Sequence, residues 1–174
     1  MIVNRQRGVR VSLRGLKGFA ISASELLRLP EESLTVCLVT NAEIARWNRA
    51  YRGKPEPTDV LSFPVRAGRG RFAPKKRGKG TASRASKTAV ASSDAAFDSA
   101  DSLDSRAGSV YLGDIAIAPR VARRNAARLG RTFESEMRIL ILHGMLHLMG
   151  YDHETDTGQM DRRERRLRRA LGLA

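Results

Sequence analysis

Apolar residues along this chain fall into short β-branched runs and into longer segments of helical character. The runs "SLTVCLVT" and "DVLSFPV" are rich in Val, Leu and Thr, which predicts buried strands. Helices and strands alternate, which predicts an α+β fold, a mixed sheet with helices packed on it. We expect strands at 1–6, 33–40, 59–65 and 109–119, and helices at 13–29, 40–51, 120–129, 132–149 and 156–171.

Two helix starts carry clear capping signals. Thr40 and Glu43 have the spacing of a capping box, in which each side chain satisfies the other's backbone. Thr132 is a good N-cap, and Glu134 and Glu136 then stand in the first turn, where the helix dipole favours acids. The segment "ILILHGMLHLM" that follows is apolar almost all round, so we expect this helix to be central and buried.

Between 66 and 108 the composition changes. "RAGRGRFAPKKRGKGTASRASK" holds nine basic residues and no acidic one, and the Ser/Ala/Asp-rich remainder holds four aspartates. Neither half shows apolar periodicity, which predicts a disordered insertion in a single domain of residues 1–174. The basic half would either contact nucleic acid or act as a solvated tether.

The net charge is +14, from 32 Lys and Arg against 18 Asp and Glu, which suits a polyanionic partner or simply a soluble basic protein. Cys37 is the only cysteine, so neither an intramolecular disulfide nor a thiolate metal cluster can form, and no disulfide-linked partner is expected. Its apolar surroundings predict a buried, inert thiol. The sequence shows no secretory signal and no membrane-span-length apolar run, so we expect a cytoplasmic protein without membrane partners.

All three histidines lie in "HGMLHLMGYDH". His143 and His147 are four residues apart, so they share one helix face. Gly150 favours a helix end in the left-handed conformation, after which the chain can turn and bring His153 to the same pocket. Three imidazoles with one open position are typical of a catalytic zinc site, with one ion held by three histidines and a water.

The same stretch has the spacing of the protease motif H-E-x-x-H-x-x-G-x-x-H, but Gly144 stands where the general-base glutamate belongs. Zinc alone lowers the pKa of bound water to about 7, so hydroxide stays available, but peptide hydrolysis is disfavoured. Asp152 would either orient a histidine or cap the turn.

"HGMLHLMGYDHE" resembles the signature of the YbeY family of bacterial rRNA-processing endoribonucleases. Three more stretches agree with that family: "NRAYRGKPEPTDVLSFP", "LGDIAIAP" and "TNAEIARWN". Together with the helix leading into the histidines they cover nearly all of the chain outside 66–108, and that insertion is the departure from the family. The resemblance implies a zincin-like α+β domain with a mixed four-stranded sheet and about five helices.

By this resemblance His143, His147 and His153 bind zinc, and Arg52 of "YRG" lies in the catalytic cleft, acting with His143. A guanidinium suits that place because it stabilises charge on phosphoryl oxygens through paired hydrogen bonds. With an RNA substrate implied, the cleft at Gly144 lacks a carboxylate that would repel a phosphate, so we interpret Gly144 as a sign of that substrate. Asp114 of "LGD" also matches the family; it would line the cleft or hold a strand end.

The family is associated with cleavage of single-stranded RNA, maturation of the 16S rRNA 3′ end and ribosome quality control. The implied partners are rRNA, the small ribosomal subunit and ribosome-associated proteins. The basic run "RRERRLRR" would add to RNA affinity or be a solvated face. Two alternatives stay open: a ribosome-assembly RNA-binding factor with a structural zinc, and a metalloprotease.

Overall fold

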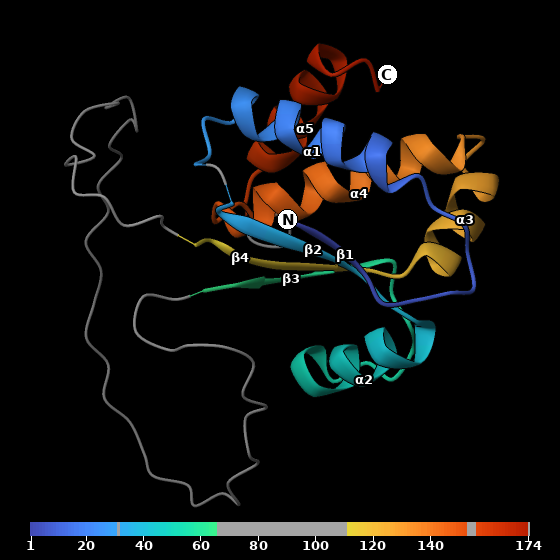
Figure 1. Ribbon diagram of the computed structural model, residues 1–174. Coiled ribbons are helices and arrows are strands. Elements are labelled where there is room, and N and C mark those ends of the chain that lie inside the picture. Colours follow the sequence, from blue (N-terminus) through green and yellow to red (C-terminus); the bar gives the residue numbers. More distant parts are fainter. Residues whose placement is uncertain (31, 66–110, 153–155, 174) are drawn as a thin grey trace, which may run out of the picture. The chain divides into compact units, whose positions relative to one another are not determined.

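A four-stranded mixed sheet is the scaffold of this chain (Figure 1). The computed structural model describes residues 1–30, 32–65, 111–152 and 156–173. The strands are β1 (Ile2–Asn4), β2 (Leu34–Leu38), β3 (Val60–Pro64) and β4 (Gly113–Ile117), in the order β1-β2-β4-β3. β1, β2 and β4 are parallel, and β3 pairs antiparallel with β4 at the edge.

Helices lie on both faces of the sheet (Figure 1). They are α1 (Leu13–Leu26), α2 (Asn41–Arg52), α3 (Pro119–Arg128), α4 (Phe133–Leu148) and α5 (Gln159–Ala170). α1 and α4 cover one face, and α2 lies on the other. Strand alternation explains the two layers: Val36 and Ile115 belong to the larger core with α1 and α4, whereas Ala116 packs with Ile44 of α2.

The predicted fold class is confirmed, and the helix caps explain why the helices begin where they do. The Thr40 hydroxyl accepts from the Glu43 amide while the Glu43 carboxylate accepts from the Thr40 amide, which completes the capping box. The Thr132 hydroxyl accepts from the Ser135 amide and starts α4. α5 begins at Gln159, three residues later than expected, because the Asp156 carboxylate accepts from the amides that precede and open the helix.

Gly150 and the insertion at 66–108 were also subjects of sequence predictions. Gly150 has a φ of 92°, as its place after α4 predicts. The insertion at 66–108 lies outside the described residues, so a single interrupted domain stays a prediction. Within the described ranges no helix is both long and apolar enough to cross a bilayer.

Candidate functional site

His143 and His147 are the partly exposed residues in an otherwise buried stretch of α4. Between Ile139 and Leu148 they are the only two residues that are not fully buried. Their Nε2 atoms lie 3.1 Å apart and the ring planes stand at 76° to each other. The helix therefore points the same nitrogen of both imidazoles at one place, as the spacing of four residues predicts.

Glu164 of α5 fixes the orientation of the first imidazole. Its Oε2 lies 3.1 Å from His143 Nδ1, and its other oxygen accepts a hydrogen bond from the Arg168 guanidinium. An ionised carboxylate can only accept, so the proton of a neutral His143 ring belongs on Nδ1. The lone pair of Nε2 then faces His147. This is the carboxylate–histidine pairing that accompanies most histidine metal ligands.

Glu164 is only 6% exposed. Burial by itself would raise the pKa of the Glu164 carboxyl, but the hydrogen bond and charge of His143 and the charge of Arg168 outweigh it and hold that pKa below its ordinary value. The carboxylate is therefore ionised at neutral pH, which keeps it an acceptor for the Nδ1 proton.

The separation of the two histidine Nε2 atoms is close to that of two nitrogen ligands on one zinc ion. Zn–N distances of about 2.0–2.1 Å put two tetrahedral nitrogen ligands about 3.3 Å apart, and the observed Nε2 separation is 3.1 Å. His153, the third predicted ligand, lies outside the described residues. In the part of the chain that the structure describes, no three His, Cys, Asp or Glu side chains form a metal-binding group. The zinc site with three histidines stays a prediction.

Gly144 has a packing role that the sequence did not reveal. A Cβ at this position would lie 2.7 Å from Ile115 Cγ2 and 2.9 Å from its Cδ1, so α4 can approach β4 this closely only with glycine. The backbone at Gly144 also contacts the edge strand: the Ser62 hydroxyl of β3 donates to the Gly144 carbonyl at 3.3 Å. This packing explains the glycine without reference to a substrate, so our interpretation of Gly144 as a sign of the substrate stays a prediction.

Arg52 is the last residue of α2 and is exposed. Its neighbour Tyr51 packs edge-on against Phe63 of β3, with 4.9 Å between ring centroids. β3 in turn contacts the histidine helix through Ser62, so Arg52 is carried on a helix end anchored to the same edge strand. A catalytic role for Arg52 stays a prediction.

Asp114 lies on the sheet face that α2 covers, because it alternates with Ile115 of the opposite core. The Tyr111 hydroxyl donates to Asp114 Oδ1 at 2.6 Å and lies 2.8 Å from Thr35 Oγ1. Burial and this hydrogen bond raise the pKa of Tyr111 to about 12. The described contact of Asp114 is thus one that holds the start of β4.

Asp152 and Cys37 complete the set of predicted residues. Asp152 is half-buried beyond the end of α4, and its carbonyl accepts from the Asp156 amide, which is a turn contact. A role for Asp152 in orienting a histidine stays a prediction. Cys37 was expected to be buried, but it is only half-buried. The reason is that it lies on the β2 face opposite the larger core.

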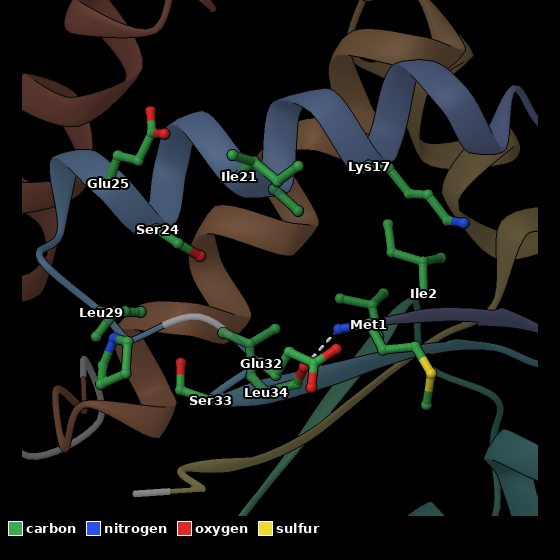
Figure 2. A pocket seen from close by; sticks show the side chains of 13 residues that line it. Met1, Ile2, Lys17, Ile21, Ser24, Glu25, Leu29, Glu32, Ser33 and Leu34 are labelled. Atoms are coloured by element: carbon green, nitrogen blue, oxygen red, sulfur yellow. Dashed lines mark hydrogen bonds between the residues drawn. The ribbon is translucent and has the colours of Figure 1, made fainter. Parts of the chain in front are cut away.

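Two hollows in the surface lie away from the histidines. One, of about 420 Å³, is lined by arginines of α5. The other, of about 460 Å³, lies between α1 and the β1–β2 edge, where Ile21 and Leu34 face one another and Lys17 and Glu25 stand at the rim (Figure 2). Its mainly aliphatic lining offers no metal ligand set, so the histidine pair remains the candidate site.

Glu164 is the site residue that sequence reasoning missed. It stands inside the basic run "RRERRLRR", which we interpreted either as a contributor to RNA affinity or as a solvated face. The available signal was its helical spacing: Glu164 is four residues after Met160 and three before Leu167, both of which are buried. A lone acid on the apolar face of a basic helix indicates a buried polar partner.

The fold and site together define an α+β protein in which a mixed four-stranded sheet lies under a central helix that presents two converging histidines. The model of the family described as Endoribonuclease YbeY matches residues 6–172. The chain therefore belongs to the endoribonuclease YbeY family.

Individual relatives agree with that assignment. A protein named endoribonuclease YbeY from Desulfitobacterium hafniense is 34% identical, over 94% of this chain and 88% of its own. Another of that name, from a Sulfurovum species, is 29% identical over 98% and 90% of the two chains. The solution structure of TM1509 from Thermotoga maritima, at 23% identity, superposes with a TM-score of 0.52 over 98% of this chain and 89% of that one, which supports the fold.

Proposed function

We propose that this chain is a zinc-dependent endoribonuclease that cleaves single-stranded segments of rRNA in the cytoplasm, in maturation of the 16S rRNA 3′ end and in ribosome quality control. Membership of the family supports RNA cleavage in rRNA processing. The observation that carries the metal dependence is the convergence of two Nε2 atoms at 3.1 Å, with one ring oriented by a buried carboxylate.

In this proposal His143 and His147, joined by His153, hold the ion, which would polarise a phosphate oxygen or supply hydroxide. Glu164 keeps the proton of His143 on Nδ1, so that Nε2 stays available as a ligand. Arg52 offers paired N–H groups to the phosphoryl oxygens as charge builds on them. The small ribosomal subunit supplies the RNA, and ribosome-associated proteins are the other proposed partners.

Cleavage of a labelled single-stranded RNA with the sequence of the 16S 3′ end tests the proposal, with metal content measured on the same samples. We expect His143→Ala to lose both metal and cleavage, and Arg52→Ala to keep the metal and lose cleavage. Arg49→Ala is the matched control, since Arg49 is exposed on the same helix one turn earlier and should cleave as wild type does.

Three outcomes would go against the proposal. Retention of metal and activity by His143→Ala would remove the site, and normal cleavage by Arg52→Ala would remove that residue's role. Wild-type protein that binds the RNA with zinc present but never cleaves it would favour the assembly-factor alternative. Product ends decide the nucleophile, because a 2′,3′-cyclic phosphate excludes direct attack by metal-bound water.

A further inference from the structure

The outward face of α5 is a continuous arginine stripe. Arg162, Arg165, Arg166 and Arg169 are spaced so that they follow one another along one side of the helix. All four are exposed, and together they line the hollow of about 420 Å³. We call these four residues the arginine stripe.

Carboxylates neutralise this face only in part: the charge of Asp156 interacts with Arg162 at the start of the stripe. α5 contains two acids, and Glu164 is buried on the other side of the helix, where His143 and Arg168 occupy it. Asp161 stands in the first turn, and the Arg165 guanidinium contacts its backbone carbonyl. Within the described residues no salt bridge involves a member of the stripe. Surface arginines that are merely solvated are commonly interspersed with acids, so the one-sided charge indicates an anionic ligand.

The inner face of α5 joins the stripe to the rest of the protein. Met160 and Leu167 bury the inner face of α5, and Glu164 joins it to His143. At 100° per residue the stripe is centred about 150° around the helix from Glu164. An anion bound there would therefore lie on the side of α5 turned away from the histidines, outside the candidate metal site.

We propose that the arginine stripe is a second RNA-binding surface, which grips the phosphate backbone of the strand flanking the cleavage point. This inference rests on the proposed function. Seven residues of helix advance about 10 Å, which matches two or three successive phosphates of an extended strand. Guanidinium–phosphate contacts of this kind give affinity without base specificity.

Binding of a 5′-labelled single-stranded RNA of about 20 nucleotides to the metal-loaded protein tests the stripe. It is measured by fluorescence anisotropy in an Arg52→Ala background, which prevents cleavage and keeps the metal. The test variant carries Arg165→Gln, Arg166→Gln and Arg169→Gln. We expect affinity near 0.1 M salt to fall about 10- to 100-fold and the slope of log K against log salt to shrink by about 2, at about 0.7 per lost contact.

The matched control removes the same charge from α3 through Arg120→Gln, Arg124→Gln and Arg128→Gln, all exposed positions on that helix. We expect it to bind within about threefold of wild type with an unchanged slope. With Arg52 retained, the stripe variant should cleave an RNA of about five nucleotides normally and lose efficiency only on the long one.

Equal binding by the stripe variant and wild type, or equal losses in both triple variants, would overturn the proposal. So would stripe-dependent flotation with vesicles of anionic phospholipid together with unchanged RNA binding, which would assign the stripe to a membrane surface. Because binding is measured without cleavage, a wild-type protein that never cleaves would refute the proposed function while a weakened stripe variant would still support the stripe.

Discussion

Replacement of Gly144 by alanine tests the packing of α4 on β4 directly. A helical Gly→Ala change usually stabilises a protein by about 1 kcal/mol. Here the new methyl would meet three Ile115 carbons at 2.7, 2.9 and 3.0 Å, whereas carbon contacts prefer about 3.5–4.0 Å. Ile115 is fully buried and cannot swing away. Overpacking of this kind costs about 1–3 kcal/mol, so we expect a net loss of about 0–2 kcal/mol.

Gly18 is the matched control because it is also a helical glycine, in α1, but a Cβ there would meet nothing within 4 Å. Gly18→Ala should therefore show the uncompensated gain of about 1 kcal/mol. Urea unfolding of both variants, compared through their midpoints at constant m, measures the difference, which we expect to be about 1–3 kcal/mol.

The cause can be isolated by repeating Gly144→Ala in an Ile115→Ala background. Once the isoleucine side chain is gone, the alanine at 144 should become neutral or stabilising, and the double-mutant cycle should show a favourable coupling of about 1–3 kcal/mol. A Gly144→Ala protein as stable as Gly18→Ala would refute the close approach of α4 to β4.

Three further predictions concern the site and its supports. Glu164→Gln should lower metal affinity about 10- to 100-fold, since a neutral amide holds the Nδ1 proton of His143 less firmly; chelator competition with Co²⁺, whose visible spectrum reports ligand geometry, measures this, and unchanged affinity would contradict the pairing. Thr40→Ala should cost about 1 kcal/mol of unfolding free energy through the lost α2 cap, and Thr40→Ser should restore most of it in the same urea assay. Burial, and secondly the Asp114 charge, raise the pKa of Cys37 above its ordinary 9.0, because both disfavour the thiolate. Alkylation of Cys37 by iodoacetamide should therefore reach half its maximal rate above pH 9.0, and Asp114→Asn should lower that midpoint. An unmoved midpoint would show that Asp114 has no influence on this pKa.

The fold was predictable because its signals are local. The Thr40–Glu43 capping box and the Thr132 cap are written within four residues of sequence, and both form as expected. The sheet order and the antiparallel placement of β3 depend instead on pairing between distant segments, which residue patterns alone do not encode.

The candidate site was predictable only where it depends on helix geometry. Spacing was enough to place His143 and His147 together. Two features of the site were not predicted, because each depends on a contact with a residue that is distant in sequence. Glu164 contacts His143 across 21 positions, and the need for glycine at 144 comes from Ile115 on β4. A charge run and a motif comparison describe neither contact.

Under the proposed function, the bond between Glu164 and His143 makes the docking of α5 and the affinity for the metal two coupled equilibria. A metal that favours the oriented His143 ring also favours α5 in its docked position, and the two effects are equal by reciprocity. α5 is otherwise held by few buried apolar side chains, chiefly Met160 and Leu167. Local undocking of α5 would therefore release metal before the sheet unfolds. Conversely, the supply of metal would set the fraction of molecules in which α5 is docked.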